Sequence, residues 1–332
     1  MKKLISIILF SVLMLGALIG CAQKNGETTG NSAAEETRVS VVTTIFAPYD
    51  FARVITGGNA DLTMLLPPAS ESHSYEPSPQ DIIKIQNSDI FIYVGGETDS
   101  WVEAILKSMD TDKMKIISLL ECVEVVEEEI VEGMQVGHGE DDSEHDDEDD
   151  DDHGEEKEFD EHVWTSPKNA KLIVKKIYDT LCEVDAENRD AYSKNTESYL
   201  TELDKLDDEF QSVVDSASRR LIVFGDRFPF RYFADAYDLE YFAAFPGCST
   251  ETEASAATVA FLIDKINAED IPVVFHAELS NQKMADIISE GTGAKILQLH
   301  ACHNVSKAEF ESGIGYLELM RQNVQNLKEA IQ

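Results

Sequence analysis

Five histidines stand outside the long acidic stretch of this chain, and their positions suggest a metal site. They are His73, His162, His276, His300 and His303. One histidine alone is more often a satisfied polar residue than a ligand, but these five gather beside the ends of expected strands or the starts of expected helices. Imidazole-rich coordination suits Zn²⁺ in tetrahedral geometry, whereas oxygen-rich coordination suits Mn²⁺ and Mg²⁺. The residue types therefore favour zinc.

The elements that must position these histidines alternate between strands and helices. In the first half, β-rich segments at 38–46, 61–66, 89–94 and 115–119 alternate with helical patterns at 79–87 and 101–109. The second half has expected strands at 220–224, 241–245, 272–276 and 295–299, and expected helices at 232–237, 254–268, 282–290 and 315–331. Such alternation predicts parallel sheets that helices cover on both faces.

A helical stretch at 187–216, without glycine or proline, separates the two halves. About 30 residues at 1.5 Å each would span roughly 45 Å, which is too long for one small lobe. We therefore predict an α/β fold of two (βα) lobes with parallel sheets: an N-terminal lobe at 38–184, a linking helix at 185–217 and a C-terminal lobe at 218–332. Ligands bind outside the carboxyl ends of strands in such folds, so the expected metal site is the cleft between the lobes.

The first residues resemble an export signal. The charged start MKK is followed by an apolar run and by Leu18-Ile19-Gly20-Cys21, which resembles the bacterial lipobox, whose cysteine is lipidated. The segment 22–37 is polar like a flexible tether. We expect a lipoprotein signal peptide at 1–21, lipidation of Cys21, and a mature chain anchored to the cell membrane on its extracytoplasmic side. A membrane-spanning helix is the alternative.

The acidic stretch supplies much of the net charge of −37. Between residues 138 and 161 the sequence contains 16 acidic residues and one lysine. This balance argues against nucleic acid and favours cations as partners. Like charges repel, so we expect an insert at 127–159 to be disordered. Its imidazoles, His138, His145 and His153, would bind Zn²⁺ weakly at additional sites, and a solubilising spacer is the alternative.

Two motifs stand out, PPASESHSYEPSPQD at 67–81 and DEHVWTSP at 160–167. Together they resemble a known family, the metal-binding subunits of bacterial zinc and manganese ABC importers (solute-binding protein family 9). The acidic, histidine-rich insert ahead of the second motif is similar to that of the zinc-type members. The resemblance implies two lobes bridged by one rigid helix, with one metal at their interface that is passed to a membrane permease.

The resemblance also implies candidate ligands. His73 and His162 match the two ligands of the N-terminal lobe. The family's third ligand is a histidine in an H-x-x-F-x-Y motif, but this chain reads RFPFRY, with Arg227 in its place, and Asp226 next to it could supply an oxygen. The fourth position falls on His303 or, in a second alignment, on His300. The predicted set is His73, His162 and His303, completed by Asp226, His300 or water.

Four cysteines follow Cys21, and none forms a CxxC pair, so a zinc ribbon is excluded. Cys248 and Cys302 lie in loops after two expected strands. Thiols of exported proteins tend to become oxidised, so we expect a Cys248–Cys302 disulfide. Ligation of zinc by a thiolate is the alternative.

These observations predict an extracytoplasmic, high-affinity zinc-binding protein that delivers Zn²⁺ to an ABC permease and its ATPase. We expect a monomer. A manganese- or iron-binding subunit of the same type of importer is one alternative, and a surface metal buffer or adhesin is another. No HExxH motif is present, so we expect a binding protein rather than an enzyme.

Overall fold

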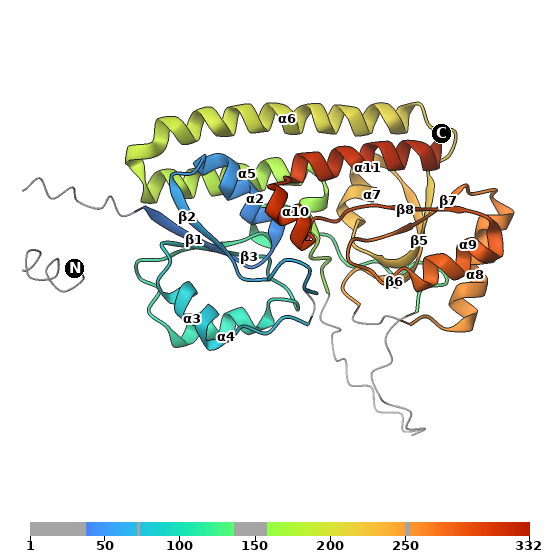
Figure 1. The fold of residues 1–332 in the computed structure, drawn as a ribbon, viewed down its shortest axis with the longest axis horizontal. Coiled ribbons are helices and arrows are strands. Elements are labelled where there is room, and N and C mark those ends of the chain that lie inside the picture. The colour runs from blue at the N-terminus through green and yellow to red at the C-terminus, as the bar shows by residue number, and fades with distance from the viewer. Residues whose placement is uncertain (1–37, 72–73, 136–157, 250–252) are drawn as a thin grey trace, which may run out of the picture. The chain divides into compact units, whose positions relative to one another are not determined.

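Two four-stranded parallel sheets carry the fold, one in each lobe (Figure 1). The structure is a computed structural model that describes residues 38–71, 74–135, 158–249 and 253–332. The sheet of the N-terminal lobe has the order β2-β1-β3-β4. Its strands are β1 (Val39–Thr43), β2 (Ala60–Met64), β3 (Ile90–Tyr93) and β4 (Lys115–Ser118). Helices α2 (Phe46–Thr56) and α5 (Pro167–Val184) cover one face, and α3 (Pro79–Gln86) and α4 (Ser100–Ser108) cover the other.

The sheet of the C-terminal lobe has the order β6-β5-β7-β8. Its strands are β5 (Leu221–Phe228), β6 (Glu240–Pro246), β7 (Val273–His276) and β8 (Lys295–Gln298). Helices α8 (Ala256–Ala268) and α9 (Lys283–Thr292) pack on one face, and α7 (Arg231–Tyr237) and α11 (Tyr316–Ile331) pack on the other. The short helix α10 (Lys307–Ser312) precedes α11. The predicted α/β class with parallel sheets in two lobes is confirmed.

The long helix α6 (Arg189–Asp215) joins the lobes, as predicted. It packs against α2 and α5 of the N-terminal lobe and against α7 and α11 of the C-terminal lobe (Figure 1). Apolar residues at helical spacing form its inner face, and they are buried: Tyr192, Tyr199, Leu203, Leu206, Phe210 and Val213. The predicted boundaries of the lobes at 184/185 and 217/218 stay predictions, because residues 38–332 form one compact unit.

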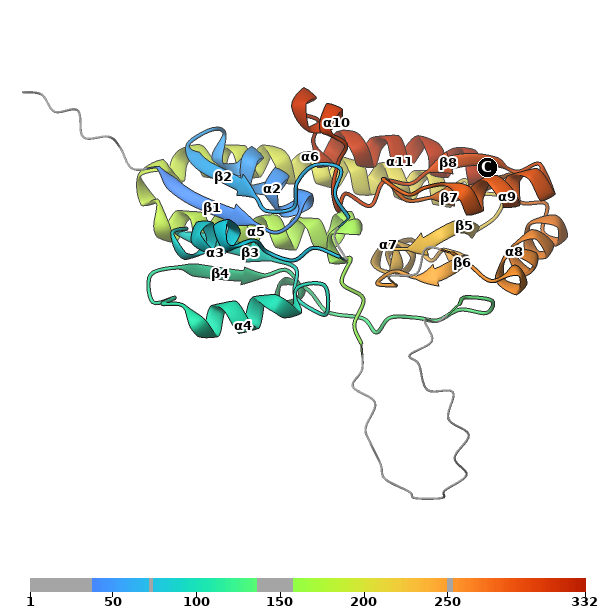
Figure 2. The same cartoon turned by 60° about the horizontal axis from the view of Figure 1, so that its bottom comes forward.

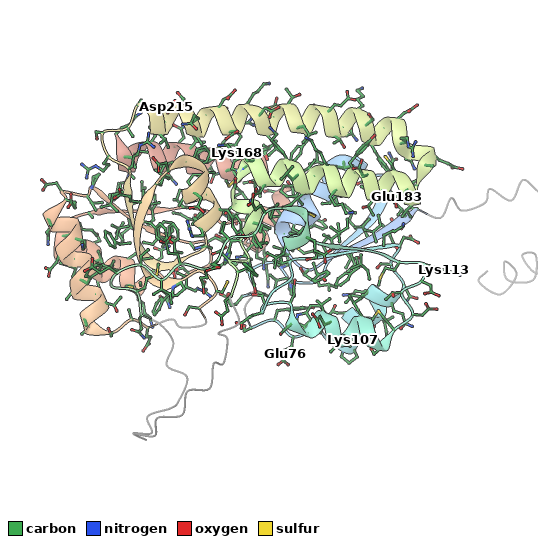
Figure 3. The ribbon with its side chains drawn as sticks, turned by 180° about the vertical axis from the view of Figure 1, so that it is seen from behind. Glu76, Lys107, Lys113, Lys168, Glu183 and Asp215 are labelled. Carbon is green, nitrogen blue, oxygen red and sulfur yellow. The ribbon has the colours of Figure 1, made fainter. Side chains whose placement is uncertain are left out.

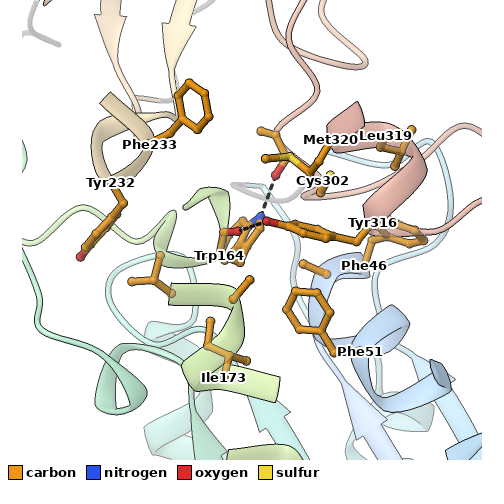
Figure 4. Close-up of a cluster of buried hydrophobic side chains, with 14 of the residues drawn as sticks. Phe46, Phe51, Trp164, Ile173, Tyr232, Phe233, Cys302, Tyr316, Leu319 and Met320 are labelled. Carbon is orange, nitrogen blue, oxygen red and sulfur yellow. Dashed lines mark hydrogen bonds between the residues drawn. The ribbon is translucent and has the colours of Figure 1, made fainter. Parts of the chain in front are cut away.

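One continuous apolar core extends through both lobes. At its centre Trp164, which precedes α5, lies close to Tyr316 of α11 (Figure 4). The Trp164 indole N–H donates to the Ala301 carbonyl oxygen at 2.7 Å, and the Tyr316 hydroxyl donates to the Trp164 carbonyl oxygen at 2.8 Å. Phe51 of α2 meets the Tyr316 ring edge-on at 5.0 Å. The interface between the lobes is therefore packed and hydrogen-bonded at its centre.

The acidic segment at 124–135 lies against the C-terminal lobe, which corrects the prediction of disorder for the whole of 127–159. Figure 2 shows this segment running from the end of β4 toward β6 and α8. The Gln135 amide donates to the Ala244 carbonyl oxygen at 2.8 Å, and Gly133 packs directly on the Phe261 ring. Individual acids are also paired, for example Glu132 with Lys265 at 3.2 Å. Specific partners thus offset the mutual repulsion of the acids here.

Charged side chains cover the outside of the described structure, as Glu76, Lys107 and Lys113 illustrate (Figure 3). Within the described ranges, no helix has both the length and the apolar character that crossing a membrane requires.

Candidate metal centre

His162 is fully buried at the entrance to the short 3-10 helix Val163–Thr165, just ahead of α5. Asp160 holds it in two ways: the carboxylate accepts the His162 backbone N–H at 2.8 Å and lies 3.1 Å from the imidazole Nδ1. A carboxylate at Nδ1 favours the tautomer with its proton there, which makes Nε2 the atom suited to a metal. Asp160 is held in turn by the Tyr232 hydroxyl, which donates to its carbonyl oxygen at 2.8 Å.

The electrostatic surroundings of His162 are strongly acidic. Burial by itself lowers the pKa of the imidazole, but the negative charge of Asp160 and the hydrogen bond to it act in the opposite direction, and Glu161 and Glu128 add to the rise. The net result is a pKa above the ordinary value of 6.5. The site is therefore built to hold positive charge on or beside this imidazole.

His303 reaches the same place from the other lobe. It lies in the loop that follows β8, and its ring stands edge-on to that of His162, with centroids 4.7 Å apart and an interplanar angle of 87°. The Trp164 ring packs against His303 at 4.8 Å. Two histidines that are 141 residues apart in the sequence are thus neighbours across the interface.

Glu278 is a site residue that sequence reasoning missed. Its carboxylate accepts the backbone N–H of Ala301 at 2.6 Å and that of His303 at 2.9 Å, and its side chain is only 6% exposed. Glu278 therefore fixes the loop that presents His303. A signal was present in the sequence, because Glu278 follows the end of β7 as His303 follows the end of β8.

A small cavity of about 40 Å³ opens beside His303, lined by residues of both lobes. They include Ser70, Glu71, Arg227, Gly247, Glu278 and His303. Gly247 connects this cavity to His162, because a Cβ on Gly247 would come within 3.0 Å of the His162 ring and 3.1 Å of the Asp160 carboxylate. The two lobes approach this closely only because residue 247 has no side chain.

His300 makes other contacts. Its backbone exchanges two hydrogen bonds with the side chain of Asn323 on α11, at 2.7 and 2.8 Å. Its Nδ1 accepts the backbone N–H of Cys302 at 3.0 Å and lies 3.7 Å from the Glu278 carboxylate. His300 therefore stabilises the backbone of this loop, whereas His303 of the same loop contacts His162.

Asp226 and Arg227 also have partners in the described structure. The Asp226 carboxylate accepts the backbone N–H groups of Arg227 at 2.8 Å and Ala277 at 3.1 Å. The Arg227 guanidinium pairs with Glu71 of the N-terminal lobe at 3.0 Å. A guanidinium is a permanent cation without a lone pair for a metal, so Arg227 does not take the part of the family histidine.

The predicted disulfide between Cys248 and Cys302 is wrong, since the structure has both as free thiols. Cys302 lies inside the interlobe core beside Met320 (Figure 4). Cys248 instead lines a larger cavity, of about 530 Å³, together with Glu128 and Glu161. The two side chains therefore lie in different surroundings. Burial raises the pKa of both thiols, which favours their neutral form over the thiolate that zinc would need.

The larger cavity is strongly acidic. Its carboxylates are Glu97, Asp99, Glu103, Glu128, Glu158 and Glu161. Burial raises the pKa of Asp99 to about 6, although the backbone N–H groups of Val94 and Gly95 donate to it. Since Glu161 and Glu128 also raise the pKa of His162, this cavity extends the negative field of the centre.

Several predicted site residues lie outside the described residues, namely His73, the insert histidines His138, His145 and His153, and the lipidation site Cys21. Within the described part of the chain, no three His, Cys, Asp or Glu side chains form a group that could hold a metal ion. The described residues thus bring together two imidazoles, His162 and His303, and a complete ligand set needs at least one further donor.

Comparison with known proteins agrees with this architecture. The chain is 30% identical over 314 residues to the high-affinity zinc uptake system protein ZnuA of Bacillus subtilis, covering 95% of this chain and 94% of that protein. The crystal structure of the metal-dependent lipoprotein YcdH from Bacillus subtilis has a TM-score of 0.71 at 28% identity, covering 89% of this chain and 99% of that one.

A second solved structure, the Zn(II)-bound ZnuA-like domain of Streptococcus pneumoniae AdcA, has a TM-score of 0.70 at 26% identity, covering 89% of this chain and 99% of that domain. The chain spans 61% of the length of the whole AdcA lipoprotein. The family profile described as zinc-uptake complex component A, periplasmic, matches residues 41–330. With this match over most of its length, the chain belongs to the ZnuA family of zinc-uptake components, as its two motifs predicted.

Proposed function

We propose that this chain captures Zn²⁺ at the lobe interface and delivers it to the permease and ATPase of an ABC importer. The observation that carries the proposal is the edge-on contact of His162 and His303, one from each lobe, with Asp160 behind His162. Paired imidazoles with a carboxylate at the remote nitrogen form the usual donor arrangement for zinc. The B. subtilis relative named for high-affinity zinc uptake supports the same cargo.

The proposed ligands are His73, His162 and His303. His73 follows Glu71 by two residues, and Glu71 lines the cavity beside His303. Of the candidates for a fourth ligand, Asp226 and the His300 Nδ1 already accept backbone N–H groups, so water is favoured. Imidazole ligands favour Zn²⁺ over Mn²⁺ or iron, whose sites need more oxygen donors.

The remaining parts of the proposal concern location and delivery. Cys21 is the proposed lipidation site, residues 22–37 the tether, and the segment of the insert around His138, His145 and His153 a weak accessory collector of Zn²⁺. We propose a monomer without catalytic activity. The acidic cavity next to the centre supports the collecting role, because a cleft of one charge sign concentrates counter-ions.

The direct test is a competitive Zn²⁺ titration of the protein from Ala22 onward, compared with a deletion of residues 138–157 and with His73→Ala. One tight site that survives the deletion and is lost in His73→Ala would support capture at the interface. Loss of tight binding in the deletion variant would instead identify the chain as a metal buffer that works through its insert.

Zinc affinity is expected to fall on acidification. Because the pKa of His162 is raised, a proton competes with Zn²⁺ for the imidazole at a higher pH than for an ordinary histidine. The stability of the metal-free protein should change in the opposite direction. The raised pKa of His162 stabilises the fold at a pH below 6.5, its pKa in the unfolded chain, and this contribution is lost as the pH rises through the pKa of the folded state. Titrations and melting curves with and without zinc between about pH 7.5 and about pH 5.5 measure both effects.

The control for this pH prediction is Asp160→Asn, which removes the main group that raises the pKa of His162. Its affinity should begin to fall at a lower pH than in the wild type. A wild-type affinity that stays constant over the whole range would contradict histidine ligation.

Replacing Glu278 by alanine is expected to weaken zinc binding by about 10- to 100-fold, as loss of groups that support metal ligands does. The change leaves the Ala301 and His303 N–H groups without their acceptor, at a cost of about 1–3 kcal/mol each. Titration and denaturant unfolding measure the two effects. Glu278→Gln keeps one acceptor oxygen and should lose less of both, and an unaltered affinity in Glu278→Ala would show that the loop holds His303 without it.

A further inference from the structure

Arg227, near the end of β5, contacts two loops at the cavity beside His303. Its guanidinium contacts the Glu71 carboxylate at 3.0 Å and 3.4 Å, and it donates to the Ser249 carbonyl oxygen at 3.2 Å. The pairing of β5 with β6 shifts register between Phe224 and Arg227. Such an irregularity re-aims the side chain that follows it. Arg227 thus leaves the end of β5 and reaches the N-terminal lobe.

Glu71 belongs to the loop between β2 and α3. The C-terminal lobe makes further hydrogen bonds to this loop. The Asn304 side chain donates to the carbonyl oxygens of Pro67 at 2.7 Å and Ser70 at 2.9 Å. The Ala69 N–H donates to the Val305 carbonyl oxygen at 2.8 Å. These bonds fix the first part of the loop, and the ion pair with Arg227 holds the next residue, Glu71.

The ion pair lies on the solvent side of the cavity. The cavity is lined on its inner side by Ala301 and Asn304, which are buried, whereas the Arg227 and Glu71 side chains are 18% and 44% exposed. Leu279, which is 43% exposed, also lines the cavity, so the pair forms one part of its solvent-facing rim. A cation that leaves His303 on that side passes the pair. The pair itself is electrically balanced, so it blocks the path without adding net charge to it.

We propose that Arg227 and Glu71 form a latch across the cavity that sets the rate at which the bound cation exchanges with solvent. This inference rests on the proposed function, since the cation is the Zn²⁺ held at His162 and His303. The guanidinium contacts of Arg227 in the described structure are with Glu71 and Ser249, neither of which is a proposed ligand, and Arg227 acts through Glu71. It occupies the position of a family ligand, but it restrains the metal by closing the cavity rather than by coordination.

Single and double substitutions distinguish the latch from a simple charge effect, because they change the equilibrium affinity and the release rate of zinc differently. Glu71→Gln leaves the Arg227 cation beside the metal and should weaken equilibrium affinity, whereas Arg227→Gln leaves the Glu71 anion and should strengthen it. In the double variant Glu71→Gln/Arg227→Gln these charge effects cancel, but the closure is still lost. The double variant should therefore keep the wild-type affinity within about twofold and release zinc about fivefold faster, the size expected of a partly exposed ion pair.

The experiment is stopped-flow transfer of Zn²⁺ from the loaded protein to a chelator, together with an equilibrium titration, for the wild type, both single variants and the double variant. Added salt should speed release from the wild type, because it screens the pair, and should have little effect on the double variant. Arg227→Lys keeps the charge but loses the two-pronged contact, and should fall between them. Glu202→Gln breaks a comparable ion pair to Arg321 at 2.7 Å, which does not line the cavity, and should change nothing.

The outcomes separate the latch from the function on which it rests. A wild-type protein without a tight zinc site would overturn both. Tight binding with equal release rates in the wild type and the double variant would overturn the latch alone. Faster release accompanied by an equal loss of affinity would also overturn it, because the pair would then stabilise the bound state rather than obstruct the path.

Discussion

His162→Ala is expected to lower the zinc affinity of this protein by at least about 100-fold. Loss of a residue that merely orients a metal ligand typically reduces affinity by 10- to 100-fold, and loss of a ligand should do more. The change removes one of the two imidazoles that meet at the interface and leaves the buried Asp160 carboxylate without its imidazole partner. A competitive titration measures the loss. Tryptophan fluorescence gives a second readout, since Trp164 lies 4.8 Å from His303.

The matched control for this prediction is His276→Gln. His276 also stands at a strand end and is buried, but its Nδ1 lies 2.7 Å from the Ala277 carbonyl oxygen, in a contact local to the end of β7. This variant should keep the wild-type affinity. If His162→Ala and His276→Gln bind zinc equally well, the interface is not the tight site, whatever the behaviour of the insert.

Trp164→Ala is expected to destabilise the fold by about 3–5 kcal/mol, the usual range for removal of a large buried aromatic side chain. Trp164 is completely buried, and its indole donates the hydrogen bond that joins the N-terminal lobe to Ala301. The substitution should also weaken zinc binding, because the Trp164 ring packs against His303. Denaturant unfolding of the metal-free protein measures the first effect without interference from zinc.

Trp164→Phe separates the two contributions. It keeps most of the packing but removes the hydrogen bond, whose net worth is about 0.5–1.5 kcal/mol. The other tryptophan, Trp101, is only partly buried on α4, so Trp101→Ala serves as the control and should lose less stability than Trp164→Ala. Equal losses at the two positions would contradict a special role for Trp164 at the interface.

Local signals account for the parts of the fold that the sequence predicted well. Ser78, Pro79 and Asp81 are residue types that favour a helix start, in agreement with the helix expected at 79–87, and the structure has the full capping box at the start of α3. Likewise, the apolar stripe of the long helix follows from its spacing alone. Capping and periodicity involve residues within one or two turns of each other, so they can be read without knowledge of distant contacts.

Two predictions depended on the direction in which side chains point, and the structure corrects both. The sequence placed Cys248 and Cys302 in loops after two strands, but one thiol lines the acidic cavity and the other enters the core. The segment 127–135 has the composition of a disordered insert, yet its acids find partners such as Lys265 on the far lobe. Neither outcome can be derived from composition, because each depends on which surface a loop happens to face.

By itself the sequence determined the two-lobed parallel architecture, membership of the family and the histidines at the strand ends, because strand–helix alternation and short motifs are local properties. Only the tertiary structure decided that His303 rather than His300 meets His162, and that Glu278 holds the loop that carries His303. It also decided that Arg227 pairs with Glu71. These choices depend on how two loops from different lobes pack against each other. A register change of one residue would exchange which side chains face the interface, and residues far apart in the chain fix that register.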